Sequence, residues 1–361
     1  MAWYKRVLSI LLAIATLLGS IYLLRDSDSS SLPNSIRCAL IRQEFKNFTG
    51  PKDVPFFTAL LIRQFPVLMQ ATEDHPVEEI RRGSEELPST PAPAVPTPAE
   101  RTYQDNGIPS QTVIPSSNAG YTVVDEVYIK NASSKTLDVN ELSDGHFDAV
   151  LQKESPQVLI VHTHGSEAYA MPKGQDYVST GTYRTSDTAF NVVRVGDEIA
   201  STLSSYGISV VHDRTLYDDP LYDGAYERSA AGIEAYLEKY PSLTYVLDIH
   251  RDAVQDASGQ QYKLITKEDP HCAQISFIMG SNNDHWQENL KLAIAASAAV
   301  TELCPTAMRP ITLRNSNYNQ HLTSGSMLVE IGAAGNSLEE ALTAGQLFAR
   351  GFAAAVLENT K

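Results

Sequence analysis

Cysteine is scarce in this chain, and its spacing excludes several classes of site. The 361 residues include only Cys38, Cys272 and Cys304. Three cysteines are too few for a disulfide framework, and none forms a C-x-x-C pair, so the sequence holds neither a zinc knuckle nor a thioredoxin-like redox motif. The sequence leaves open one disulfide between Cys272 and Cys304 in an oxidising compartment.

Positive charge is also in short supply. The chain carries 28 Lys and Arg residues against 43 Asp and Glu residues, which gives a formal net charge of -15 at pH 7. Proteins that bind nucleic acid usually present a basic face. The charge balance therefore excludes nucleic acid as the main partner.

One long apolar run stands at the amino terminus. Residues 7–24 carry no charged side chain and are long enough to cross a bilayer core as a helix. Lys5 and Arg6 precede the run, and although Arg25 follows it, Asp26 and Asp28 dilute the positive charge there, which favours a cytoplasmic amino end. We expect residues 1–25 to be a cytoplasmic tip with a transmembrane anchor in the cell membrane, and the rest to be extracytoplasmic. A cleaved signal peptide is the alternative, although LLRDSD contains no A-x-A-like cleavage site.

Composition divides the rest of the chain into three parts. Residues 26–82 include enough apolar side chains for a short amphipathic helix or hairpin beside the membrane, and we assign them no chemistry. Residues 83–120 are rich in proline, serine and threonine and poor in large aliphatic residues, which predicts a flexible linker. Residues 121–361 then form the folded domain.

The folded domain alternates short β-rich runs with longer helical stretches. This pattern predicts an α/β domain with a mostly parallel, open sheet and helices on both faces. Near-continuous apolar character suits strands that are buried on both sides. The clearest strands are residues 158–162, 208–212, 244–250, 275–280 and 326–332, and the clearest helices are residues 190–207 and 288–305.

Three of these strands finish beside a side chain that can bind or serve a metal. They are His162 or His164 after the first strand, His250 after the third and Glu330 near the end of the last. Ligands of open α/β sheets bind at the carboxyl ends of the strands. Two imidazoles and a carboxylate form the ligand set of many hydrolytic zinc sites, and a further carboxylate can serve as the base. We therefore predict a Zn²⁺ site with Glu330 as the catalytic base.

A series of motifs in the same order closely resembles one protein family, the stage II sporulation protein P family of membrane-anchored peptidoglycan hydrolases from endospore-forming bacteria. The resemblance runs from about Val127 to the carboxyl end, whereas the amino-terminal third is similar only in its layout of anchor and tether. The motifs are VHTHGSEAY, NVVRVGDEIASTL, HDRTLYD, YERSAAGIEAYLEKYP, VLDIHRDA, NLKLA and YNQHLTSGSMLVEIGAAGNSLEEA.

The resemblance implies a zinc-dependent N-acetylmuramoyl-L-alanine amidase that cuts the amide between muramic acid and the first alanine of the stem peptide. It also implies endopeptidase action on cross-links, and work beside stage II sporulation proteins D and M at the septum during engulfment. The family is distantly similar to the wider zinc amidases, which places His164 and His250 on the metal and Glu330 in catalysis. The alternatives are a cross-link endopeptidase, or a wall-binding organiser of the engulfment complex without catalytic activity.

The second metal ligand has two candidates. The wider zinc amidases have a glutamate where this chain has Asp187, four residues before Asn191. Glu167, three residues after His164, belongs to the HTH-x-x-E element that is characteristic of the sporulation family, and we prefer it slightly. His162 is a further alternative as the imidazole donor, which would leave His164 to orient substrate.

Residues beside these motifs are candidates for contacts with substrate or for purely structural roles. Arg251 and Asp252 follow His250 and either contact substrate carboxylates or form an internal salt bridge. Asp248 lies on the same face of the strand as His250, and we expect it to hydrogen-bond to backbone. The YNQ motif, made of Tyr318, Asn319 and Gln320, is expected to contribute to the substrate wall.

Overall fold

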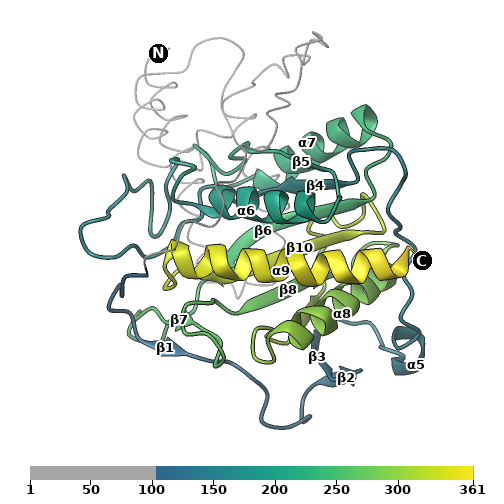
Figure 1. Ribbon diagram of the computed structural model, residues 1–361, viewed down its shortest axis with the longest axis horizontal. Coiled ribbons are helices and arrows are strands. Elements are labelled where there is room, and N and C mark those ends of the chain that lie inside the picture. The colour runs from purple at the N-terminus through teal and green to yellow at the C-terminus, as the bar shows by residue number, and fades with distance from the viewer. Residues whose placement is uncertain (1–102, 361) are drawn as a thin grey trace, which may run out of the picture. The chain divides into compact units, whose positions relative to one another are not determined.

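The computed structural model describes residues 103–360. Its centre is an eight-stranded sheet in the order β2-β3-β9-β8-β10-β6-β4-β5 (Figure 1). Two further strands, β1 and β7, form a separate two-stranded sheet. The strands are β1 (Ser110–Gln111), β2 (Thr122–Val124), β3 (Val127–Ala132), β4 (Val158–Val161), β5 (Val210–His212), β6 (Tyr245–Asp252), β7 (Lys263–Leu264), β8 (Ile275–Gly280), β9 (Ile311–Arg314) and β10 (Ser326–Ala333).

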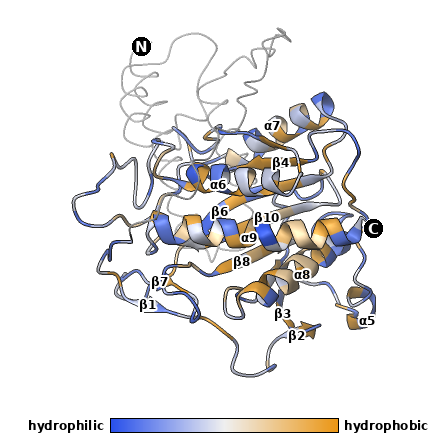
Figure 2. Ribbon diagram, viewed as in Figure 1, coloured by the Kyte–Doolittle hydropathy of each residue, from blue (hydrophilic) through white to orange (hydrophobic). Residues whose placement is uncertain are grey.

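Most neighbouring strands of the large sheet run in parallel. The antiparallel pairs are β10 with β8 and β2 with β3, and the other five pairs are parallel. The five strands predicted from sequence all lie in this sheet, with ends that differ by a few residues. The predicted α/β architecture is confirmed, and hydrophobic residues run along β4 and β8 inside the sheet (Figure 2).

Three long helices cover one face of the sheet. Helix α9 packs between α6 and α8, as Figure 1 shows. Aromatic side chains fill the space beneath α9, where Tyr245 of β6 meets Phe352 edge-on and Phe277 of β8 meets Phe348. The helices of residues 103–360 are α5 (Val139–Leu142), α6 (Val192–Ser205), α7 (Ala225–Lys239), α8 (Trp286–Leu303) and α9 (Leu338–Asn359).

Local sequence explains where the covering helices begin and how closely they pack. The Asn191 side chain accepts a hydrogen bond from the Val193 amide at the start of α6, and Ser337 with Glu340 forms a capping box at the start of α9. Gly351 of α9 lies where a Cβ atom would overlap Val300 of α8. This glycine therefore allows the two helices to approach closely.

Successive side chains of β6 point to opposite faces of the sheet. Leu247 and Ile249 join the large core under α9, so Asp248 and His250 face the opposite side. Helix α7 lies on that opposite side. Its Ser229 hydroxyl is 2.7 Å from Oγ1 of Thr163, and the Thr163 hydroxyl in turn donates a hydrogen bond to Asp248. The second face is only partly covered, and its open part holds the candidate site.

The carboxyl-terminal part of the predicted linker is docked on the domain. Ser110 and Gln111 pair with Lys263 and Leu264 as β1 and β7. The Asn106 side chain donates to the carbonyl groups of Ala170 and Gly335. Residues 103–113 are thus held on the domain by hydrogen bonds, within the range 83–120 for which composition predicts a flexible linker.

The remaining predictions for the amino-terminal third lie outside the described residues. They are the anchor in residues 7–24, the juxtamembrane segment at residues 26–82 and the first part of the linker. Within residues 103–360, no helix combines the length and apolar character needed to span a bilayer.

Candidate metal centre

The candidate centre lies at the carboxyl ends of three adjacent parallel strands. Strands β10, β6 and β4 are neighbours, and Glu330 of β10 stands opposite His250 of β6. The chain leaves β4 and makes a turn in which the Glu167 amide donates to the His164 carbonyl. The predicted convergence of His164, His250 and Glu330 at one edge of the sheet is therefore present.

His164, Glu167 and His250 bring three donor atoms together. One donor atom from each residue lies within 4.8 Å of the other two. Nδ1 of His250 is 3.3 Å from Oε2 of Glu167, and Nδ1 of His164 is 3.9 Å from Oε1. Donors of a tetrahedral zinc site with bonds of about 2.0–2.1 Å stand about 3.4 Å apart. The two histidine–carboxylate distances are close to this spacing, so these three residues are the ones that could hold a divalent ion.

Backbone and arginine groups fix the Glu167 carboxylate. The Arg251 amide donates to Oε2 over 3.2 Å, and Nη2 of Arg184 lies 3.4 Å from Oε1. Burial opposes the charge, but hydrogen bonding with His250 and the positive charge of Arg251 lower the pKa of Glu167 to about 2. Glu167 is thus an ionised donor in a fixed position.

His250 has a carboxylate on each side of its ring. Nε2 lies 2.9 Å from Oδ1 of Asp248, in an ion contact that is poorly aligned for a hydrogen bond. Burial lowers the pKa of His250, but Asp248 and Glu167 outweigh it and raise the pKa well above its usual value. A carboxylate behind a histidine fixes which ring nitrogen faces a metal, so Asp248 would leave Nδ1 for the ion.

Asp248 is itself held in place. Its Oδ1 accepts a hydrogen bond from the Thr163 amide and its Oδ2 accepts one from the Thr163 hydroxyl. The predicted hydrogen bond from Asp248 to backbone is confirmed. Sequence analysis missed the contact of Asp248 with His250, although their spacing of two residues on a strand already placed them on one face.

Glu330 is a buried carboxyl group with an unused oxygen. Its Oε2 is buried and has no hydrogen-bond partner. Burial, followed by the charges of Asp252 and Glu167, raises the pKa of Glu330 to about 8. A carboxyl group with a pKa near neutrality is suited to exchange protons with a reacting molecule.

The donor group opens on a pocket of about 430 Å³. Glu330 and the three donor residues contribute to its wall, together with groups suited to polar ligands. Those additional wall residues include Lys130, Tyr226, Asp252, Arg309, Arg314 and Tyr318. Three of the six are cationic, although the whole chain is strongly acidic.

The two alternative metal donors lie away from this group. Asp187 is exposed, and its carboxylate accepts a hydrogen bond from the nearby Ala189 amide. His162 lies on the other face of the sheet, where its Nε2 is 2.7 Å from Nε2 of His212. On a continuous strand residues two apart would share a face, but the chain turns directly after His162, and the turn over residues 163–166 places His164 on the pocket side, away from His162.

The predicted substrate-contacting residues fall into two groups. Asp252 and Tyr318 line the pocket, and Asp252 also forms a salt bridge with Arg309. Arg251 is internal, because its guanidinium donates to the carbonyl groups of Ala168 and Tyr183.

The rest of the YNQ motif is internal as well. The Asn319 amide group donates to the carbonyl of Tyr226, and the buried Gln320 side chain bonds the backbone of Ile278 and Gly280. Asn319 and Gln320 are not among the residues that line the pocket, because protein groups already use their amides. The cationic wall residues were missed because β3 and β9 were not among the predicted strands.

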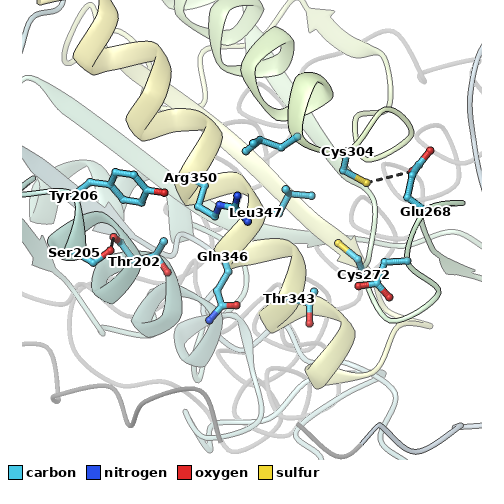
Figure 3. A pocket seen from close by; sticks show the side chains of 12 residues that line it. Thr202, Ser205, Tyr206, Glu268, Cys272, Cys304, Thr343, Gln346, Leu347 and Arg350 are labelled. Atoms are coloured by element: carbon cyan, nitrogen blue, oxygen red, sulfur yellow. Dashed lines mark hydrogen bonds between the residues drawn. The ribbon is translucent and has the colours of Figure 1, made fainter. Parts of the chain in front are cut away.

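A second cavity of about 500 Å³ lies on the helix-covered face (Figure 3). It is lined in part by Cys272 and Cys304, and both thiols are free. The Cys304 sulfur is 3.2 Å from Oε2 of Glu268. This cavity is similar in size to the first but lacks the donor group, so the donor group and not the volume identifies the candidate site.

Comparison with known proteins gives one family match and several similar structures. The family model described as stage II sporulation protein P matches residues 83–353. Stage II sporulation protein P of Bacillus subtilis is 28% identical over 195 residues, which cover 51% of this chain and 47% of that protein.

The similar solved structures include two N-acetylmuramoyl-L-alanine amidases. One, from Clostridium difficile, has a TM-score of 0.37 and 16% identity, and the match covers 57% of this chain and 97% of that one. The other, from Nostoc punctiforme, has a TM-score of 0.33 and 13% identity with the same two coverages.

Proposed function

The chain belongs to the stage II sporulation protein P family, and from this membership we propose that it is a metal-dependent peptidoglycan hydrolase of sporulation. The bond cut is the amide between N-acetylmuramic acid and the L-alanine of the stem peptide, and peptide cross-links are a second target. The observation that carries the proposal is the convergence of His164, Glu167 and His250 on a pocket that also contains Glu330.

The three donor residues fit a divalent ion, and we propose Zn²⁺. Imidazole and carboxylate donors suit zinc, and three protein ligands leave one position for water or substrate. When bound, the ion would supply Lewis-acid chemistry that activates water and polarises the amide carbonyl. Asp248 and the Arg251 amide orient His250 and Glu167 for this task.

Glu330 carries the proton transfers in this proposal. Its carboxylate takes a proton from the attacking water as the new carbon–oxygen bond forms. It then gives that proton to the leaving nitrogen as the carbon–nitrogen bond breaks, so the products are a free carboxylic acid and the amino end of the stem peptide. The unpartnered Oε2 of Glu330 leaves this carboxyl group free for both transfers.

The proposed setting is the outer side of a cell membrane. Residues 7–24 would anchor the chain and hold the catalytic domain beside the wall. Stage II sporulation proteins D and M are the proposed partners, with partner D acting on glycan strands whose peptides have been removed.

The test is digestion of purified peptidoglycan by the full-length protein, with released fragments identified by mass. We expect stem peptides that begin at alanine, and we expect a chelator to abolish their release. Glu330→Gln should lower the rate by about 10²- to 10⁴-fold with the metal retained. The matched control is Glu302→Gln on the exposed side of α8, which should act like wild type.

Two other results would contradict the amidase. Fragments cut only within peptides would assign the chain as an endopeptidase. Release of no fragments, both without and with partner D, would favour an organising role for the protein in the engulfment complex.

A further inference from the structure

The pocket contains an arginine whose hydrogen-bonding capacity is only half used. Arg309 lies two residues before the start of β9, and its side chain is 11% exposed. Nη1 donates to Oδ2 of Asp252 over 2.7 Å. Nε and Nη2 are buried and have no partner. Buried donors without partners are uncommon, so this pair indicates a ligand that supplies the missing acceptors.

The unused atoms form one edge of the guanidinium group. Nε and Nη2 point their N–H bonds in the same direction, and this edge matches the two oxygens of a carboxylate. Asp252 occupies only Nη1, and its other oxygen accepts the Ala253 amide. Asp252 therefore orients Arg309 and leaves the bidentate edge open.

The position of the guanidinium places this edge beside the reacting groups. Arg309 is bonded through its backbone to Ile275 at the start of β8, yet its side chain reaches Asp252 on β6. Strand β10 lies between β8 and β6, and it carries Glu330. An anion on Arg309 would therefore lie near Glu330 and His250.

The other two cations lie farther across the sheet. Lys130 of β3 pairs in register with Thr312 of β9, and Arg314 follows two residues later on the same face. With strands about 4.8 Å apart, β9 and β3 are about 10 and 14 Å from β10. An extended peptide advances about 3.3–3.6 Å per residue, so these cations are several residues away from the bond to be cut.

We propose that the free Nε–Nη2 edge of Arg309 binds the first free carboxylate of the stem peptide, and so helps to select the substrate. The inference rests on the proposed peptidoglycan hydrolase function. Arg309 is a specificity residue in this proposal, because it binds the peptide carboxylate and takes no part in proton transfer. Lys130 and Arg314 are placed for carboxylates farther along the same peptide.

The first test measures binding and does not depend on turnover. Two stem peptides are compared by calorimetry with the full-length chain, one with a free carboxylate at its second residue and one with a carboxamide there. We expect the carboxylate peptide to bind about 10- to 100-fold more tightly, because a hydrogen bond to a charged group is worth about 1.5–3 kcal/mol. Arg309→Gln should remove the difference.

The variants separate recognition from damage to the fold. Arg309→Lys keeps the charge but lacks the two-pronged edge, so it should restore only part of the preference. The double variant Arg309→Gln/Asp252→Asn removes both members of the salt bridge and should also bind the two peptides equally. Arg350→Gln, an exposed charge of α9 that lines the other cavity, is the control that keeps the preference.

The second test uses muramoyl peptides with the same carboxylate or carboxamide. For Arg309→Gln we expect kcat/KM to fall about 10- to 100-fold on the carboxylate substrate, chiefly through KM, and to change little on the carboxamide. Equal binding of both peptides by the unaltered protein would overturn the inference. If binding discriminates but nothing is hydrolysed, the carboxylate site stands and the hydrolase assignment fails.

Discussion

Two histidine–carboxylate clusters lie on opposite faces of the same sheet, and only one has the form of a metal site. The donor cluster is His164, Glu167 and His250, which faces the pocket. The second cluster, under α6, has two imidazoles and a carboxylate as well. Its members are His162, His212 and Asp197.

The clusters differ in where their polar atoms point. In the cluster under α6, Nε2 of His162 lies 2.7 Å from Nε2 of His212, and Nδ1 of His212 lies 3.1 Å from Asp197. Within residues 103–360, only the donor cluster brings three donor atoms within 4.8 Å of one another. Residue types alone therefore do not make a metal site, which also needs convergent atoms and an open space.

The largest expected effect comes from removing a histidine of the donor cluster. His164→Ala should lose the metal during dialysis and lower hydrolysis by more than about 100-fold. Mutating a residue that only hydrogen-bonds to a metal ligand already lowers metal affinity or activity by about 10- to 100-fold, and loss of a ligand itself should cost more. Metal content by mass spectrometry and hydrolysis of peptidoglycan measure the two losses. Retention of one zinc per chain by His164→Ala would mean that the donor cluster is not the metal site that distinguishes it from the cluster under α6.

The carboxylate of the donor cluster provides a test of similar size. Glu167→Ala should also lose the metal, whereas Asp187→Ala should keep metal and activity because Asp187 lies outside the cluster. Both variants are dialysed against the same buffer and assayed for zinc. The reverse result would assign the second ligand to Asp187 and require the loop around it to move.

The sequence was sufficient to predict the central strands of the sheet and the residues that converge on the candidate site. Apolar runs that end in His162, His250 and Glu330 identified three strands, and adjacent parallel strands bring such ends together. The choice between His162 and His164 needed the structure. Residues two apart on a strand would share a face, and only the turn that follows β4 accounts for the two rings lying on opposite faces of the sheet.

The remaining errors have a common physical cause. Residues 103–113 look like part of a linker because they are rich in polar residues, but hydrogen bonds with β7, Gln274 and Thr343 hold them on the domain. Gln320 looked like a substrate residue because it is polar beside the last strand, but backbone groups satisfy it. Composition does not reveal partners that are distant in sequence.

A smaller effect, on stability instead of chemistry, is expected for His162. His162→Ala would remove a fully buried ring and leave the Ile249 carbonyl, which lies 3.0 Å from Nδ1, without its partner. Loss of a buried side chain and a hydrogen bond should cost about 2–4 kcal/mol of unfolding free energy. Denaturant titration measures the loss, and zinc content should stay at the unaltered level below the transition.

The control for this variant is an exposed histidine. His321→Ala should change the unfolding free energy by less than about 0.5 kcal/mol, because surface substitutions are usually small. A loss of zinc from folded His162→Ala would show that the two clusters are coupled through β4.

The smallest effect, and the one most specific to the cluster under α6, is expected for Gly196. Replacing a glycine inside a helix with alanine usually stabilises it by about 0.5–1 kcal/mol. At Gly196 the new Cβ would lie 2.7 Å from Nε2 of both His162 and His212. The sign should therefore reverse, with a loss of about 1–3 kcal/mol from overpacking.

A double-mutant cycle tests whether the histidine pair causes the reversal. In a His212→Ala background the space beside Gly196 is larger, so the added methyl group should cost less than in the unaltered protein. Unfolding free energies of the four proteins give the coupling. Equal costs in both backgrounds would mean that α6 itself resists the methyl group. A reduced cost in the His212→Ala background would show that the glycine of α6 makes room for the paired rings. These rings close this face of the sheet, while the opposite face stays open.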